Sequence, residues 1–240
     1  MSYRTGPKIV TDGLVLCLDA ADRNSYPLSG STWYDLSGNG YNGTLTNGPS
    51  FNNSNGGNIV FDGTNDYVSV LNYSSLESLN TSEVTVEIFA KATGTGSYSP
   101  FILFRPDSIN AYSYLTLGNF TGYWSNESLS WYSGGEILGF AYTNGHAYFQ
   151  DSEIRQYVVT LKTNNYKLYA NGNQLTLNNS FRNGSQATSM TTDLFSGGIY
   201  IADLDNNFNG NVYRASIYNK ILSDQEIRQN YEATKGRFGL

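Results

Sequence analysis

Residues 209–240, from Asn209 to Leu240, read NGNVYRASIYNKILSDQEIRQNYEATKGRFGL, and this stretch decides the fold. Asn209-Gly210 predicts a tight turn, because both residues tolerate a positive φ. Residues 212–218 then alternate as a strand does, which places every second side chain on the same face. One face would carry Tyr213, Ala215 and Ile217, and the other Arg214, Ser216 and Tyr218. One side of the strand can therefore pack on a core while the other meets solvent or a second layer.

A helix is predicted directly after this strand, because the apolar spacing changes from two to about 3.6 residues. Ser223 can cap the free backbone N–H groups at its start, and Glu226 three residues later completes a capping box. Leu222 and Ile227 have the spacing of a hydrophobic staple around that cap. Gly236 is expected to end the helix. The sequence thus predicts a closing strand followed by one short C-terminal helix.

The rest of the chain has the composition of a β-rich protein. It holds 25 Gly and 20 Tyr in 240 residues, and only 14% of its residues are charged. Eight Asn-Gly pairs supply turns at the density that a many-stranded antiparallel fold needs. About a dozen short strand-like segments follow one another without intervening helices, which favours an antiparallel sandwich over alternating strand-helix units. The predicted fold class is therefore all-β, with a single domain over residues 1–240.

Four segments upstream are predicted strands. The apolar run from Leu14 to Leu18 is expected to be a central strand, because both of its faces are apolar. Residues 84–89 alternate, with Val84, Val86 and Ile88 on one apolar face. Segments 156–161 and 166–170 are expected to pair as a hairpin across a short polar turn.

Charge and composition argue against several classes of function. The formal net charge is −6, which offers no basic surface for a phosphate backbone, so nucleic acid is not an expected partner. No apolar run reaches the roughly 20 residues of a membrane-spanning helix, and the N-terminus has no signal-peptide core. The single cysteine, Cys17, lies within an apolar run and is predicted to be buried. We expect a protein made in the cytoplasm and not inserted in a membrane.

An ordered set of short motifs covers nearly the whole chain. The motifs are Leu14 to Ala20, Trp33 to Leu45, Phe61 to Gly63, Asp66 to Val68, Leu168 to Gly172, Phe208 to Gly210 and Ile217 to Ser223. Together they resemble the laminin-G-like domains of the concanavalin A-like lectin/glucanase superfamily. The resemblance implies a concanavalin A-like jelly-roll sandwich of two antiparallel sheets, with its core at about residues 10–235. It also implies that the first and last strands are neighbours and that the terminal helix lies against the sandwich.

Sequences of this asparagine-rich style are similar to structural proteins of tailed bacteriophages. The resemblance therefore implies a virion surface protein, made in the host cytoplasm, that acts as a capsid decoration, a fibre or part of a tail adhesion device. Its partners would be other virion proteins, in a homo-oligomer or a lattice, together with a cell-surface glycan. The short segments Met1 to Lys8 and Arg237 to Leu240 would be docking arms. The alternatives are a free carbohydrate-binding module and a glycan-cleaving enzyme.

The residues themselves do not predict an enzyme. Glycoside hydrolases of this superfamily carry two carboxylates on one strand in a Glu-x-Asp-x-x-Glu pattern, which this sequence lacks. Glu83 and Glu87 come nearest to it, but no acidic residue lies between them, and we expect both to face solvent as partners of Lys91. His146 is the only histidine, and Cys17 lies in a distant strand, so no nucleophile-base pair is expected. No catalytic residue is therefore predicted.

Calcium is the metal that the sequence suggests. Asp35, Ser37 and Asn39, followed by Gly40, reproduce the first half of a calcium loop. In such a loop alternate side-chain oxygens point inward and Gly permits the sharp turn. The spacing therefore predicts oxygen ligands for a hard cation.

This loop is incomplete, since Thr46 stands at the twelfth position, where a calcium loop carries Glu. Asp62 and Asp66 are the expected donors from elsewhere, because laminin-G-like domains often hold calcium at a sandwich edge. A second spacing of the same kind at residues 203–207 has Phe208 in place of the Gly. The alternative is that the Asp and Asn side chains cap turns by bonding their own backbone.

Four aromatic residues lie close together in a loop-rich segment: Tyr123, Trp124, Trp131 and Tyr132. Exposed rings stack against sugar faces, while side-chain amides fix the sugar hydroxyls. These residues are the predicted platform for a glycan. The alternative is that they belong to the core, since large aromatic side chains dominate sandwich interiors.

Overall fold

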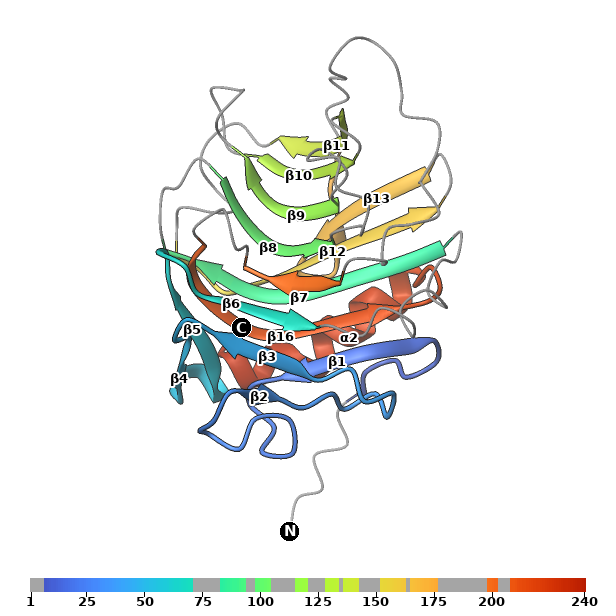
Figure 1. Ribbon diagram of the computed structural model, residues 1–240. Coiled ribbons are helices and arrows are strands. Elements are labelled where there is room, and N and C mark those ends of the chain that lie inside the picture. The colour runs from blue at the N-terminus through green and yellow to red at the C-terminus, as the bar shows by residue number, and fades with distance from the viewer. Residues whose placement is uncertain are drawn as a thin grey trace.

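The computed structural model describes residues 7–70, 83–93, 98–104, 115–120, 128–133, 136–142, 152–162, 165–176, 198–202 and 208–240. At residues 98–100, 103–104, 115–120, 128–133, 136–142 and 165–166 the description covers the backbone. Two antiparallel sheets face each other, and a helix lies against the outer face of one of them (Figure 1). The predicted all-β sandwich with a C-terminal helix is confirmed.

Sheet A, which carries the helix, has eight strands within the described residues. In spatial order they are β14 (Asn173–Gln174), β13 (Asn165–Ala170), β12 (Arg155–Lys162), β7 (Glu83–Ala92), β16 (Asn209–Tyr218), β5 (Asn58–Asp62) and β4 (Ser50–Asn52), with β1 (Leu14–Asp19) paired to the C-terminal half of β16. β12 and β13 form the hairpin that the sequence predicts.

Sheet B also has eight strands within the described part of the chain. In spatial order they are β11 (Glu136–Tyr142), β10 (Ser128–Ser133), β9 (Leu115–Phe120), β8 (Tyr98–Phe104), β15 (Ile199–Ile201), β6 (Tyr67–Val70), β3 (Gly43–Thr46) and β2 (Thr32–Trp33). A short 3-10 helix, η1 (Ser54–Gly56), connects β4 to β5. The chain crosses from sheet A to sheet B between β5 and β6, at the turn that follows Asp62.

The core lies between the two sheets and takes side chains from both. On β7 these are Val84, Val86 and Ile88, which are fully buried, as their alternation predicts. Phe101 of β8 stacks on Tyr157 of β12 with ring centroids 4.8 Å apart. Because each of these rings comes from a different sheet, aromatic packing joins the two layers directly.

β16 is the strand around which sheet A is built. It pairs with β7 along one edge and with β5 and β1 along the other, so the first and last strands are neighbours (Figure 1). A bulge between Val212 and Arg214 shifts the register. Because of this extra residue, Tyr213 packs against Phe238 of the helix rather than with Ala215 in the core. The predicted face of Tyr213 is therefore wrong.

β1 is buried, but it is not the central strand that its apolar sequence predicts. Among the described strands it pairs with β16 alone. The loop after β2 covers its other edge: the Leu36 N–H donates to the Cys17 carbonyl (2.8 Å), and Asn39 Nδ2 donates to the Val15 carbonyl (2.9 Å). The apolar sequence thus reflects burial between β16 and a loop rather than between two strands. Cys17 is buried as predicted.

The C-terminal helix, α2 (Asp224–Phe238), begins where the sequence predicts. Ser223 Oγ accepts a hydrogen bond from the Glu226 N–H (3.3 Å), and Glu226 Oε2 accepts one from the Ser223 N–H (2.8 Å), which completes the capping box. Leu222 and Ile227 pack in one buried cluster, as expected for a staple. In the part of the chain that is described, no helix has both the length and the apolar character needed to cross a bilayer.

α2 does not end at Gly236. It continues to Phe238, and Gly239 caps it in the left-handed conformation with φ 78°. Phe238 is buried, and Arg237 forms an ion pair with Asp19 at 2.7 Å. The segment from Arg237 onward, predicted to be a docking arm, completes the end of the helix that packs on sheet A.

The N-terminal segment is described from Pro7 onward, so most of the predicted arm Met1 to Lys8 lies outside the described residues. Lys8 is held against the helix, because its carbonyl accepts a hydrogen bond from Gln229 Nε2 (2.7 Å). Two residues later the Val10 N–H donates to a second side chain of α2. This end of the described chain is therefore attached to α2.

Replacing Ser223 with Ala removes the side chain that accepts the Glu226 N–H at the start of α2. We expect the free energy of unfolding to fall by about 1 kcal/mol, the usual loss for an N-cap of this kind. Urea unfolding followed by tryptophan fluorescence measures the change. Ser50→Ala on the edge strand β4 is the matched control, since Ser50 is exposed and lies outside the helix. An equal loss in both variants would contradict the capping role.

Candidate functional site

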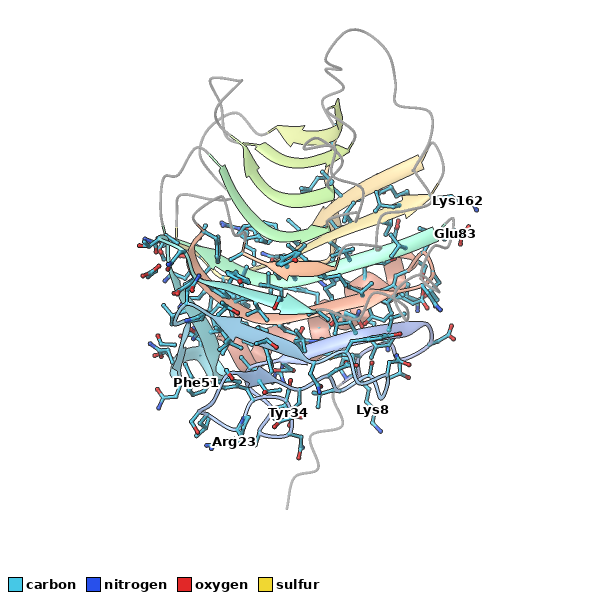
Figure 2. All side chains as sticks on the ribbon, in the orientation of Figure 1. Lys8, Arg23, Tyr34, Phe51, Glu83 and Lys162 are labelled. Carbon is cyan, nitrogen blue, oxygen red and sulfur yellow. The ribbon has the colours of Figure 1, made fainter. Side chains whose placement is uncertain are left out.

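An open hollow of about 780 Å³ lies where the segment after β1 meets the edge strand β4. We call it the Phe51 hollow; its walls include Arg23, Leu28, Phe51, Asn52, Asn53 and Gly56. Figure 2 shows Arg23 and Phe51 toward the same end of the molecule, where the edge strand β4 lies. The hollow therefore belongs to the rim of the sandwich and not to the space between its sheets.

Phe51 is held in place by contacts on its inner side. Its ring stacks on Tyr26 with centroids 5.5 Å apart, and the Tyr26 hydroxyl donates to the Gly30 carbonyl (2.9 Å). Gly57 lets the two segments approach: a Cβ there would lie 2.9 Å from the Ala20 carbonyl oxygen and 3.2 Å from the Phe51 ring. Its φ of +122° also disfavours other residues. The walls of the hollow thus depend on a glycine at this position.

The chemistry of the Phe51 hollow suits binding of a neutral polar ligand. It places an aromatic ring beside two side-chain amides and a guanidinium. The Asn52 amide oxygen accepts the Ser54 N–H (2.8 Å), which fixes that side chain on the wall. None of the described lining residues is Asp, Glu or His, so the hollow holds no group for acid-base catalysis. It can stack a sugar face and bond hydroxyls.

The predicted aromatic platform falls mostly beyond what the structure describes. Tyr123 and Trp124 lie outside the described residues. Trp131 and Tyr132 lie on β10, where a register shift between them marks a bulge opposite β11. Their side chains are outside the description as well, so their role in glycan binding stays a prediction.

The predicted calcium loop covers the free edge of β1. Asp35 Oδ1 accepts hydrogen bonds from the N–H groups of Cys17 and Ser37, both at 2.9 Å. Asp35 Oδ2 accepts the Ser37 hydroxyl (2.6 Å) and the Tyr41 N–H (3.1 Å). The amide of Asn39 donates to β1 and to Ser37 Oγ (3.0 Å). Both carboxylate oxygens of Asp35 are therefore engaged by the protein's own donors.

The expected outside donors hold a turn of their own. Asp62 Oδ1 accepts the Thr64 N–H (2.7 Å), and Asp66 Oδ2 accepts the Asp62 N–H (3.1 Å). Among the described residues no three Asp, Glu, His or Cys side chains form a group that could hold a metal, so Asp35 is not brought together with this pair. The second spacing, at residues 203–207, lies outside the description. Calcium binding itself stays a prediction.

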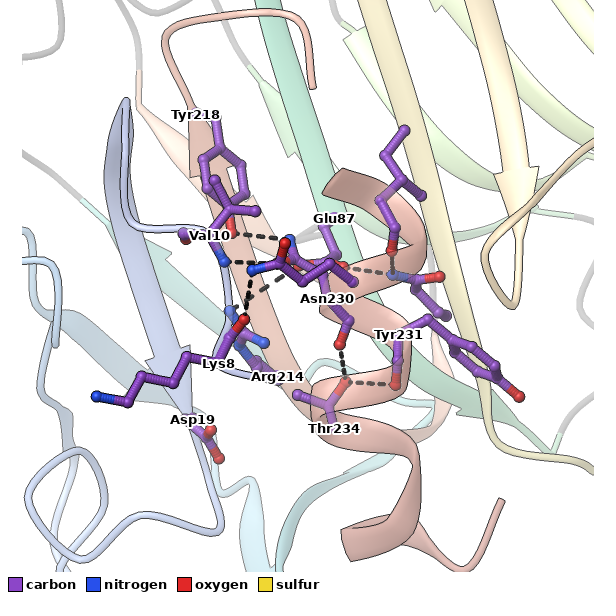
Figure 3. A network of polar contacts seen from close by, with 12 residues as sticks. Lys8, Val10, Asp19, Glu87, Arg214, Tyr218, Asn230, Tyr231 and Thr234 are labelled. Atoms are coloured by element: carbon purple, nitrogen blue, oxygen red, sulfur yellow. Dashed lines mark hydrogen bonds and ion pairs between the residues drawn. The ribbon is translucent and has the colours of Figure 1, made fainter. Parts of the chain in front are cut away.

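Glu87 is not the solvent-facing partner of Lys91 that the sequence predicts. Its side chain is 1% exposed, between β7 and α2. Its carboxylate accepts hydrogen bonds from Gln156 Nε2 and from Asn230 Nδ2, the latter at 3.2 Å, and Arg214 Nη2 lies 3.9 Å from Oε2 (Figure 3). The physical reason is the helix, because alternation places Glu87 on the outer face of sheet A and α2 covers that face.

The two glutamates of β7 therefore do not resemble a catalytic pair. Burial raises the pKa of the Glu87 carboxyl, while Arg214 and the two amide donors oppose that rise. Glu83 instead forms an exposed ion pair with Lys162 of the neighbouring strand β12. His146 lies outside the described residues. The Glu87 carboxylate is therefore closed off from solvent.

Of two features that sequence reasoning missed, one has a weak signal in the sequence and the other has none. Phe51-Asn52-Asn53, an aromatic residue followed by two amides just before an Asn-Gly pair, is a signal for a polar binding edge. Arg214 has no such signal, since a charged residue in an alternating strand predicts a solvent-facing position. Its burial follows only from the helix that covers the strand.

Comparison with known proteins identifies the fold. The family model of the concanavalin A-like lectin/glucanases superfamily matches residues 62–228, which is more than half of the chain. None of the curated proteins matches the chain in sequence. Solved structures match it across most of its length, but at low sequence identity.

Three of these structures show how similarity and coverage vary among the matches. Domain 4 of the arabinanase AbnA from Geobacillus stearothermophilus, in complex with arabinotriose, has a TM-score of 0.62 at 16% identity, with 91% of this chain and 98% of that chain covered. The binding domain of botulinum neurotoxin DC, in complex with SialylT, has 0.62 at 15%, covering 93% and 52%. The sialidase of Trypanosoma rangeli, in complex with sialic acid, has 0.59 at 15%, covering 94% and 33%. The chain thus spans about a third of the sialidases it matches, and at these identities the likenesses show the fold alone.

Stability should depend on pH through Glu87. Because burial raises the pKa of this carboxyl above its ordinary 4.5, the folded state binds the proton more tightly than the unfolded state. The resulting contribution to the free energy of unfolding is fully present below pH 4.5 and is lost as the pH rises through the folded-state pKa. Glu87→Gln removes this contribution. We therefore expect the free energy of unfolding of wild type minus that of the variant to be larger at pH 4 than at pH 7, by about 1.4 kcal/mol per unit of raised pKa.

Urea unfolding of both proteins at the two pH values measures this gap. Glu83→Gln is the matched control, because it removes one carboxylate from the same strand at an exposed ion pair. A gap for Glu87→Gln that is the same at both pH values, or no different from that of the control, would show that burial does not raise the pKa of Glu87.

Proposed function

Because this chain belongs to the concanavalin A-like lectin/glucanase superfamily, we propose that it is a non-enzymatic glycan-binding protein on the surface of a bacteriophage particle. The Phe51 hollow is the observation that carries the glycan-binding part of the proposal. It gathers an aromatic ring, two amides and a guanidinium in one open space, which are the groups that stack on sugar faces and bond hydroxyls. The fold is lectin-like, and because a fold does not fix a function, the argument rests on the hollow.

Two structural relatives support a glycan as the class of ligand. The arabinanase domain is in complex with arabinotriose, and the toxin binding domain is in complex with SialylT. The arabinanase domain is also similar in extent, since this chain covers 98% of it. We therefore take arabino-oligosaccharides and sialylated glycans as the first ligands to test.

Binding without catalysis is supported by where the acids lie. The described lining of the Phe51 hollow contains no carboxylate. Glu87, the buried glutamate of β7, is sealed beneath α2 and shielded from any substrate. A glycosidase needs two accessible carboxyl groups on either side of the scissile bond. A glycan-cleaving enzyme is the alternative that these positions disfavour.

The proposed location on a virion is supported by the amino-acid composition. The low share of charged residues and the many Asn-Gly turns resemble tailed-phage structural proteins. The proposal places the chain in a capsid decoration, a fibre or a tail adhesion device, assembled with other virion proteins as a homo-oligomer or a lattice. A free carbohydrate-binding module that acts as a monomer is the alternative.

A glycan array followed by calorimetry tests the site. Phe51→Leu keeps apolar bulk against Tyr26 but removes the aromatic face, and we expect at least tenfold weaker glycan binding, about 1.4 kcal/mol. Tyr34→Leu is the matched control, because Tyr34 is an exposed aromatic residue, at 44%, that does not line the hollow. Binding should be unchanged in that variant.

The array also decides between the hollow and the predicted aromatic platform. Loss of binding in Trp124→Ala, with Phe51→Leu unaffected, would place the site on the segment that contains Tyr123, Trp131 and Tyr132. If wild type binds no glycan on the array, the glycan-binding part of the proposal is wrong.

Immunogold labelling of the intact phage particle tests the location. We expect gold on the particle exterior in a regular arrangement, because an assembled surface protein repeats with the symmetry of the particle. Recovery of the chain only in the particle-free fraction would contradict the virion location and favour the free module.

A further inference from the structure

Arg214 is a buried cation whose hydrogen-bonding groups are not used by the protein. It lies on the outer face of β16, and its side chain is 1% exposed. Within the described residues, Nε, Nη1 and Nη2 all lack a hydrogen-bond partner. A guanidinium carries five N–H donors. Leaving a buried donor unpaired costs about 1–3 kcal/mol, and more for a charged group, so this arrangement needs a partner.

Glu87 does not supply that partner. Its Oε2 lies 3.9 Å from Arg214 Nη2, which is too far for a hydrogen bond. Its two oxygens already accept hydrogen bonds from Gln156 and Asn230. Glu87 therefore offsets the charge of Arg214 without satisfying its N–H groups.

Asp19 does not supply it either, although it lies directly across the strand pair from Arg214. Its Oδ1 accepts the Ala21 N–H (3.0 Å), and its Oδ2 accepts a hydrogen bond from Arg237 (2.7 Å). The Asp19 carboxylate is thus already bound by Arg237 at the C-terminal end of α2. The buried Cys17 thiol also faces Arg214, but sulfur is a weak acceptor, so the donors of Arg214 stay unpaired within the described residues.

An open groove of about 590 Å³ leads to Arg214, between the N-terminal segment, β1 and α2. Besides Arg214, its lining includes the cations Lys8 and Arg237 and the anions Asp19 and Asp22. Figure 3 shows Arg214 between Asp19 on β1 and the residues of α2, and the ammonium of Lys8 points away from it. Since Arg237 is already paired with Asp19, Arg214 is the cation of this lining whose buried donors a ligand could use.

We propose that this groove binds a small carboxylate, to which Arg214 donates two parallel hydrogen bonds. The planar fork of a guanidinium matches the two oxygens of a carboxylate in this bidentate way. A carboxylate would satisfy the donors that the chain leaves unpaired. The carboxylate is carried by an acidic sugar or by a small organic acid. This site is separate from the Phe51 hollow and does not depend on the proposed function.

Thermal shift and calorimetry of the full chain test the proposal with three probes at equal ionic strength. These are glucuronate, acetate and, as the neutral counterpart of the first, glucose, each in a chloride background. We expect both carboxylates to raise the melting temperature and to bind, and glucose to do neither. Glucuronate binding at least tenfold tighter than acetate identifies an acidic sugar as the source, and equal binding identifies a small organic acid.

Arg214→Lys keeps the charge but removes the fork, so carboxylate binding should weaken at least tenfold. Arg228→Lys is the matched control, because Arg228 is an exposed arginine of α2, at 52%, outside the groove. Ala233→Met places a longer side chain in the groove while leaving Arg214 intact, and it should abolish binding even if Arg214→Lys does not fold.

The proposal is wrong if carboxylates shift the melting temperature no more than chloride does, in which case water alone satisfies Arg214. It is equally wrong if binding survives both Arg214→Lys and Ala233→Met. Binding of neutral glycans at the Phe51 hollow should be the same in these variants as in wild type. The two proposed sites are therefore tested independently.

Discussion

The rest of the structure depends on the hydrogen bonds made by the side chain of Asn230. From the middle of α2 its Oδ1 accepts the Val10 N–H (2.8 Å), and its Nδ2 donates to Glu87 Oε2 (3.2 Å) and to the Tyr218 hydroxyl (3.0 Å). One fully buried amide thus ties the N-terminal segment, β7 and β16 to the helix (Figure 3). Because a buried polar group must be satisfied, only one rotation of α2 on sheet A meets this requirement.

Helix α2 limits which parts of sheet A are open to solvent. The outer face of sheet A is closed by α2, so its polar residues serve the packing of the helix, and an opening remains at Arg214. The Phe51 hollow begins directly after the end of β1, because Ala20 and Ala21, which follow Asp19, line it. The C-terminal end of α2 supports both places: Arg237 pairs with Asp19, and Asn55 Nδ2 donates to the Phe238 carbonyl (2.9 Å). The two candidate sites are therefore built on one contact region.

Local chemistry made much of the fold predictable. The capping box at Ser223 and the alternation of β7 are decided by neighbours in the sequence, and the structure has both. The errors occur where a distant element changes the environment. Tyr213 changes face because a bulge adds a residue to β16, and Glu87 is buried because α2 covers a face that alternation alone assigns to solvent. Gly236 lies within the helix because packing of Phe238 extends α2 by a further half turn.

The loop at Asp35 shows why a site is harder to predict than a fold. Alternate oxygens that converge on one point are what calcium requires, and they are also what the N–H groups of an unpaired strand edge require. The sequence spacing is the same in both cases. The difference lies in what is opposite the loop, and here it is the free edge of β1, whose Cys17 N–H bonds to Asp35. Any cation at this loop would have to compete with those N–H groups, so the same side chains that close the sheet edge also limit what the loop can bind.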